Sequence, residues 1–196
     1  MPERKASISR KTKETDISLA IDLDGTGKSD IKTSIGFFSH MMELFTRHSL
    51  CNTALSAEGD TEVDYHHTVE DVGLVLGEAV EKALGDKKGI TRYGFASVPM
   101  DEALCQTSID LGGRPHMSFT CDMPTDKVGE FDTELCRDFF QAVATAGKMN
   151  IHITASGGQN THHVIESVFK SFARALRQAV APDSRETGVP STKGVL

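Results

Sequence analysis

The chain of 196 residues contains no tryptophan, only two tyrosines and only four cysteines. Cys51, Cys105, Cys121 and Cys136 are far apart and form no Cys-x-x-Cys pair. This spacing argues against a disulfide framework and against a thiolate zinc site, so we expect buried thiols in a reducing compartment.

The sequence also lacks a long apolar run and an excess of positive charge. No uninterrupted hydrophobic stretch approaches the length of a membrane span. The net charge is -7, which argues against a nucleic-acid partner because phosphate binding needs basic residues. Hydrophobic content of 38% and charged content of 25% are ordinary for a globular protein. We therefore expect a soluble, acidic, cytoplasmic protein that binds neither nucleic acid nor membranes.

The most informative feature present is a short motif that occurs twice. Residues 66–70 read His-His-Thr-Val-Glu, and residues 162–166 read His-His-Val-Ile-Glu, 96 positions later. On a helix each glutamate shares a face with both histidines. Adjacent histidines point about 100° apart, so the two of a pair can serve different metal ions. A capping or core role is the usual alternative for a histidine on a helix, and the repetition of the group disfavours it.

Hydrophobic periodicity predicts the elements of the first half. Alternation over 17–23 predicts a strand, and 31–35 a return strand, so the opening is expected to be a hairpin. The period then changes and predicts a helix over 36–48, which carries His40 and His48. A strand over 50–57 leads to the first motif. The helix that begins there is expected to end at Gly85, a typical residue after a helix C-terminus.

The second half shows a similar order. Strands are predicted over 103–111 and 116–121, joined by a turn over 112–115. A helix follows over 132–146 with Asp132 as its N-cap, then a strand over 149–155 and a helix from near Thr161. We expect one pseudo-symmetric domain, 1–196, with halves over about 7–90 and 91–181. Residues 182–196 form a polar tail, which would ordinarily be frayed.

The two motifs supply most of the candidate metal ligands. His66, His67, Glu70, His162, His163 and Glu166 offer six ligand groups, and His40 adds a seventh from the preceding helix. Imidazole and carboxylate in this number favour Mn²⁺ over Fe²⁺ or Zn²⁺. Arg92, Arg114, Lys170 and Lys193 lie near the motifs. Each is ordinarily a surface charge, and together they are a weak signal for a phosphorylated substrate.

Nine ordered motifs make the chain resemble the imidazoleglycerol-phosphate dehydratase family from about Arg10 to Leu196. Among them are Gly-Phe-Phe-Ser-His-Met (36–41), Pro-Met-Asp-Glu-Ala (99–103) and Phe-Asp-Thr-Glu-Leu (131–135). The others are residues 13–15, 64–71, 113–115, 160–166, 174–179 and 190–196.

The resemblance implies a hydro-lyase of L-histidine biosynthesis. Its reaction would be dehydration of D-erythro-imidazoleglycerol phosphate to imidazole acetol phosphate, with the imidazole(ate) ring held by two Mn²⁺ ions per active site. The implied fold is α+β: a duplicated, ribosomal protein S5 domain 2-like half of a four-stranded sheet and two helices, with the helices packed between two sheets. The implied assembly is a homo-oligomer, an octahedral 24-mer built from trimers, with active sites between subunits.

The resemblance also implies roles for individual residues. The metal ligands would be His40, His66, His67, Glu70, His162, His163 and Glu166. Glu14 would be the acid or base, with His67, Glu70, His163 and Glu166 as further catalytic residues. The substrate would contact Glu14, His40, His48, His66, Glu70, Arg92, Arg114, His162, Lys170, Ser191, Thr192 and Lys193. The tail would then be ordered over the bound substrate.

The chain departs from the family pattern at two positions. Asp138 stands where many members carry a histidine that ligates manganese. Because Mn²⁺ accepts oxygen ligands, direct ligation by Asp138 and a solvent-facing role are both open. Ser39 stands where an aspartate is frequent. Two other functions are compatible with the motifs: a two-metal phosphate-ester hydrolase, and a non-enzymatic cage joined by metal ions.

Overall fold

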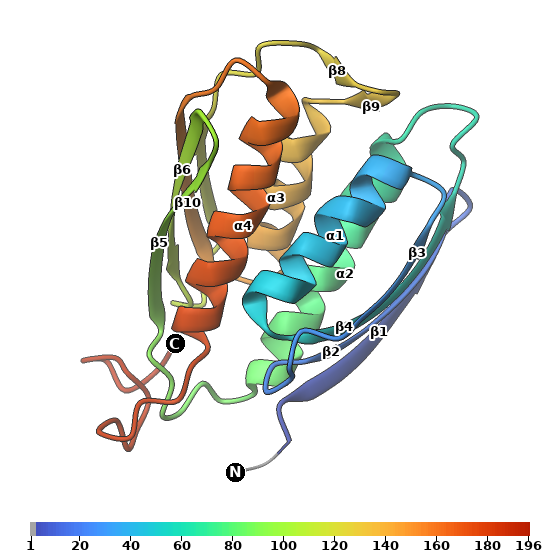
Figure 1. Cartoon of the computed structure of the whole chain (residues 1–196). Helices are drawn as coiled ribbons and strands as arrows, with labels where there is room; N and C mark the ends of the chain where they lie inside the picture. The colour runs from blue at the N-terminus through green and yellow to red at the C-terminus, as the bar shows by residue number, and fades with distance from the viewer. Residues whose placement is uncertain (1–2) are drawn as a thin grey trace.

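The computed structural model describes residues 3–196, so Met1 and Pro2 of the expected domain lie outside the described residues. Two four-stranded sheets enclose a layer of four helices (Figure 1). This arrangement confirms the predicted α+β class and the packing of the helices between two sheets. Among residues 3–196, no helix is both long enough and apolar enough to cross a membrane.

The two sheets have the same strand order. The first is β1-β2-β4-β3, and the second is β5-β6-β10-β7. In each sheet the last strand of that order runs parallel to its neighbour and the other pairs are antiparallel. The first-half strands are β1 (Lys5–Lys11), β2 (Thr15–Asp22), β3 (Ser29–Thr33) and β4 (Asn52–Gly59). The second-half strands are β5 (Tyr93–Met100), β6 (Ala103–Asp110), β7 (His116–Thr120) and β10 (Asn150–Gly157).

The predicted opening hairpin is wrong. β2 pairs with β1 and β4, and β3 pairs in parallel with β4. β4 lies between β2 and β3, so the connection after β2 crosses the end of β4 to reach β3. The sequence did not predict β1 and β5 because few of their inward residues are large: Ala6 and Ile8 in β1, Gly94 and Ala96 in β5.

The helices begin close to the predicted positions, with one correction. They are α1 (Gly36–Ser49), α2 (His66–Leu84), α3 (Leu135–Ala146) and α4 (Thr161–Ala179). Asn160 caps α4, because its side-chain oxygen accepts a hydrogen bond from the backbone N–H of His162 at 3.0 Å. Asp132 is not an N-cap: it pairs with Lys127 in a short ladder of β8 (Lys127–Val128) and β9 (Phe131–Asp132) before α3.

Helices from the two halves pack against each other in one hydrophobic core. α1 contacts α4, where Phe45 stacks on Phe172 with ring centroids 6.0 Å apart. α2 approaches α3 closely, because a Cβ on Gly77 would lie only 2.6 Å from the Val143 carbonyl oxygen. A Cβ on Gly73 would lie 2.7 Å from the Phe139 oxygen. All four helices begin at the same end of the molecule (Figure 1), so their first turns are brought together.

Candidate functional site

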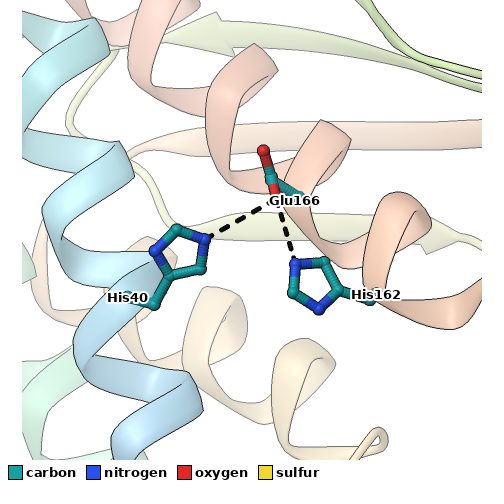
Figure 2. A group of neighbouring side chains, drawn as sticks. All are labelled: His40, His162 and Glu166. Atoms are coloured by element: carbon teal, nitrogen blue, oxygen red, sulfur yellow. Dashed lines mark hydrogen bonds and ion pairs between the residues drawn. The ribbon is translucent and has the colours of Figure 1, made fainter.

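One group of candidate ligands lies between α1 and α4. His40 Nε2 is 3.7 Å and His162 Nε2 is 3.1 Å from the same oxygen, Oε2 of Glu166 (Figure 2). One ligand atom from each residue lies within 4.8 Å of the others. His162 and Glu166 are four residues apart on α4, which places them on one face. Two nitrogen donors and one carboxylate in this arrangement suit a divalent first-row metal.

Glu166 is kept ionised by its surroundings. Burial, the largest influence, raises the pKa of this carboxyl, but the ammonium of Lys170 and the contact with His162 outweigh it and lower the pKa overall. Lys170, one turn later on α4, forms an ion pair with the other oxygen of Glu166. The carboxylate is therefore available as a ligand at neutral pH.

The equivalent group between α2 and α3 does not converge on one point. His66 Nε2 lies 3.9 Å from Glu70 Oε2, whereas His66 Nδ1 lies 3.6 Å from Asp138 Oδ2. The two carboxylates thus face different nitrogens of the same ring. Asp138 lies in the first turn of α3 and its side chain faces the motif, which the close approach of α2 and α3 makes possible.

The second histidine of each motif is held by a different carboxylate. His67 Nδ1 is 3.0 Å from Asp60 Oδ2, and His163 Nδ1 is 2.9 Å from Glu102 Oε2. These hydrogen bonds raise the pKa of both histidines, and the His163 contact helps lower the pKa of Glu102 to about 2. A carboxylate on one ring nitrogen is typical of metal-ligating histidines, because it directs the other nitrogen toward the metal.

The two histidines of the first motif face different carboxylates, Glu70 and Asp138 for His66 but Asp60 for His67, and the two rings of each motif are steeply inclined to each other. The ring planes of His66 and His67 are 78° apart, and those of His162 and His163 are 82° apart. The same motif can therefore contribute to two separate centres.

Sequence reasoning did not single out the carboxylates around the second histidines. Asp101 Oδ2 lies 3.8 Å from His163 Nε2, and Asp101, Glu102 and His163 form a second cluster of possible ligands. Asp60 lies in the turn before the first motif. In the sequence each of these residues is only an acidic residue in a turn. That pattern is too common to show which histidine the carboxylate contacts.

Glu14 lies in the turn between β1 and β2, beside the first motif. The backbone N–H of Asp60 donates to the Glu14 carbonyl oxygen at 3.0 Å. Thr15 Oγ1 donates to the buried Asp71 of α2 at 2.6 Å, so the turn is fastened to that helix. Within residues 3–196 the Glu14 carboxylate itself makes no hydrogen bond or ion pair. A fixed backbone with an unengaged carboxylate is suitable for proton transfer.

Most of the basic candidates gather around a cavity of about 720 Å³. It is lined by Arg92, Arg114 and the tail residues Ser191, Thr192 and Lys193, among others. Arg92 donates two hydrogen bonds to Asp110, at 2.7 and 3.1 Å, and one to the Pro190 carbonyl oxygen at 2.7 Å. The Asp110 carboxylate raises the pKa of Arg92. These contacts hold the tail against the start of β5.

Lys170 and His48 do not line this cavity. Both lie on the α1–α4 side of the molecule, where burial lowers the pKa of His48 and the charges of Lys170 and Arg174 lower it further. The structure therefore places Lys170 next to the metal-ligand candidate Glu166, away from the other basic candidates.

The cavity and the histidine motifs lie at opposite ends of the second sheet. Arg92 directly precedes β5 and Glu102 follows it, and β5 has eight residues. At a rise of about 3.3 Å per residue, these ends are roughly 25 Å apart. One small substrate cannot contact both groups in the same chain.

The described cysteines carry no part of the site. Cys51, Cys105 and Cys136 are buried, Cys121 is half-buried, and all four thiols are free. Burial raises the pKa of Cys51 to about 11, which makes it a poor metal ligand at neutral pH.

Comparison with known proteins gives a consistent result. The family profile described as "Imidazoleglycerol-phosphate dehydratase" matches residues 33–176. A protein of that name from Methylorubrum populi is 57% identical over 194 residues, covering 98% of this chain and 100% of the relative. One from Halalkalibacterium halodurans is 54% identical over 193 residues, covering 98% of this chain and all of the relative.

Solved structures of proteins with the same name have a similar fold. The crystal structure of imidazoleglycerol-phosphate dehydratase from Staphylococcus aureus superposes with a TM-score of 0.83 at 39% identity, covering 91% of this chain and 99% of that one. The enzyme from Pyrococcus furiosus gives a TM-score of 0.82 at 34% identity, covering 96% of this chain and 100% of that one.

Proposed function

The chain belongs to the imidazoleglycerol-phosphate dehydratase family, and from this premise we propose that its histidine–carboxylate groups hold two Mn²⁺ ions during the reaction. As a member of that family it is a hydro-lyase of L-histidine biosynthesis, which removes water from D-erythro-imidazoleglycerol phosphate to give imidazole acetol phosphate. The family is metal-dependent. Manganese, the individual site residues and the oligomeric state are our proposals.

The observation that carries the proposal is the convergence of His40, His162 and Glu166 within 4.8 Å. Two imidazoles and an ionised carboxylate fit the ligand preferences of Mn²⁺. His66, Glu70 and Asp138 would contribute to a second group, and His67 and His163 would add one nitrogen each. When bound, the metal ions would polarise the imidazole ring of the substrate as Lewis acids.

Glu14 would move the proton at the reacting carbon. Its backbone is fixed by Asp60 while its carboxylate is unengaged, so it can reach a substrate atom without first breaking an ion pair. Lys170 would keep Glu166 ionised. Such positioning of groups before the reaction reduces the reorganisation that the reaction requires.

Arg92, Arg114, Ser191, Thr192 and Lys193 would hold the substrate phosphate. Because their cavity lies roughly 25 Å from the motifs of the same chain, the phosphate site and the metal site of one complete centre would come from different subunits. This separation supports the homo-oligomer, and the octahedral 24-mer built from trimers would provide such contacts. Binding the remote phosphate would supply energy that orients the ring. The single-domain and cytoplasmic expectations stay predictions.

Metal removal tests the proposal. We expect chelation to abolish loss of water from imidazoleglycerol phosphate, and added Mn²⁺ to restore it better than Mg²⁺. Release of inorganic phosphate is measured in the same samples, since phosphate without dehydrated product would support the alternative two-metal hydrolase. Full turnover by metal-free protein would overturn the proposed role of the metal ions.

A further inference from the structure

Two glutamates occupy equivalent positions in the two halves but make different contacts. Glu14 directly precedes β2, and Glu102 directly precedes β6, the equivalent strand of the second sheet. Glu102 Oε2 is 2.9 Å from His163 Nδ1, and its Oε1 accepts hydrogen bonds from the backbone N–H groups of Gln159 and Asn160, each at 2.9 Å. The Glu14 carboxylate has no such partner among residues 3–196.

In the first half, Asp60 makes the contact that Glu102 makes in the second. Asp60 directly follows Gly59, the last residue of β4, and its two oxygens lie 3.2 and 3.0 Å from His67 Nδ1. Its backbone N–H also donates to the Glu14 carbonyl oxygen. One residue thus contacts the second histidine of the motif through its side chain and Glu14 through its backbone.

The second half has no room for an equivalent of Asp60. Gly158 directly follows Gly157, the last residue of β10, with φ at +92°. A Cβ on Gly158 would lie 2.5 Å from Val164 Cγ2 and 3.3 Å from Ala103 Cβ. A side chain there would be strained and crowded, and the carboxylate that holds His163 comes instead from the other neighbouring turn, where Glu102 lies.

We propose that Asp60 and Glu102 are matched positioning residues, and that Asp60 leaves Glu14 free for proton transfer. Each carboxylate accepts the Nδ1–H of the second histidine in its motif, which fixes the tautomer and directs Nε2 toward a metal ion. In the second half, Glu102 makes this contact from the turn before β6. In the first half Asp60 takes the task, so the equivalent glutamate, Glu14, keeps an unengaged carboxylate. The inference rests on the proposed function, since it treats His67 and His163 as ligands.

The experiment compares the equivalent variants Glu14→Gln and Glu102→Gln in the full chain, together with Asp60→Ala. Metal-stripped proteins are titrated with Mn²⁺ by electron paramagnetic resonance, and kcat is measured at saturating Mn²⁺. We expect Glu102→Gln and Asp60→Ala each to weaken Mn²⁺ binding roughly ten- to hundredfold. Glu14→Gln should leave Mn²⁺ affinity within about twofold while kcat falls about a hundredfold or more.

Two further variants separate positioning from folding. Asp60→Glu keeps the carboxylate and should restore most of the Mn²⁺ affinity that Asp60→Ala loses, which a purely structural role of the turn does not predict. If Asp60→Ala does not fold, Asp60→Asn keeps the volume and should weaken binding about tenfold, because the amide no longer selects the Nδ1–H tautomer.

The outcomes distinguish this inference from the proposed function. If the unmodified chain binds no Mn²⁺ or turns over without metal, the proposed function fails. If the unmodified chain requires Mn²⁺ but Asp60 and Glu102 variants bind it as tightly, only the positioning roles are overturned. Equal losses of Mn²⁺ affinity in Glu14→Gln and Glu102→Gln would likewise contradict the division of tasks.

Discussion

The α1–α4 group and the α2–α3 group use the same motif in different surroundings. In the first, Glu166 is buried, contacts both His40 and His162, and is paired with Lys170 one turn later. In the second, the side chain of Glu70 is 47% exposed, and the residue one turn later is Leu74.

The residue contributed by the neighbouring helix also differs between the two groups. His40 faces the same carboxylate oxygen as the motif histidine, whereas Asp138 faces the opposite nitrogen of His66. The two halves therefore share the backbone positions of the candidate ligands, while the residues across from each motif differ. We expect one strong and one weaker metal site.

The largest effect is expected from removing His40, the candidate ligand that α1 supplies to the α1–α4 group, and a much smaller one from removing Asp138. His40→Ala should weaken Mn²⁺ binding roughly a thousandfold, more than the ten- to hundredfold loss typical for a partner outside the ligand shell. Asp138→Ala should weaken Mn²⁺ binding tenfold or less, because Asp138 and Glu70 face different nitrogens of His66. Calorimetric titration of metal-stripped variants measures both values. Asp138→His serves as the reciprocal variant and should tighten the weaker site, and equal losses in the two alanine variants would remove the difference between the groups.

A smaller effect is expected from Lys170, which only the α1–α4 group possesses. Lys170→Met leaves Glu166 buried without its cation, and should lower the free energy of unfolding of the metal-free protein by about 3 kcal/mol at pH 7. Urea unfolding measures this, with Lys82→Met as control, since Lys82 is exposed and forms no ion pair among residues 3–196.

The penalty of Lys170→Met should depend on pH in a defined direction. The folded protein lowers the pKa of Glu166 from its ordinary value of 4.5, so the stabilisation is present above that value. It is lost as the pH falls through the lowered pKa. The difference between Lys170→Met and the unmodified chain should therefore shrink in acid, and a constant difference from pH 7 to pH 3 would contradict this account.

The smallest effect is expected at the close contact that only the α2–α3 pair makes. Gly77→Ala places a Cβ 2.6 Å from the Val143 oxygen and 2.7 Å from the Gly147 nitrogen, so the helices must separate. We expect a loss of about 2 kcal/mol in urea unfolding. Gly36→Ala is the matched control, because a Cβ there meets no atom within 4 Å. An unchanged stability in Gly77→Ala would show that the close approach is not required.

The sequence predicted the parts of the fold that have strong periodicity. α1, α2 and α4 were found because their apolar stripes are long, and α2 also carries a terminal signal at Gly85. The pairing of β3 with β4 could not be predicted, since it depends on which strand enters between β2 and β3. The two sheets together were implied by the family resemblance, and the periodicity alone gave only alternating strands and helices.

The sequence indicated which types of side chain gather at the candidate site, as the group of His40, His162 and Glu166 illustrates. The spacing within each motif indicated the shared face and the diverging rings. It could not show which nitrogen faces which carboxylate, because these contacts join residues far apart in the chain: Glu102 and His163 are separated by 61 positions. The proposed division of tasks between Asp60 and Glu102 was equally hidden, since the position equivalent to Asp60 in the second half is the crowded Gly158.

The common direction of the four helices has an electrostatic consequence. Their peptide dipoles add rather than cancel, and each N-terminus carries about +0.5 of an elementary charge. The end with the histidine motifs is therefore the positive pole of the helical layer (Figure 1), which favours negative charge close to the first turns of the helices. The opposite end is the negative pole, so at the proposed phosphate site Arg92, Arg114 and Lys193 would have to offset that field. The common orientation of the helices therefore favours carboxylates at one end of the subunit and basic side chains at the other.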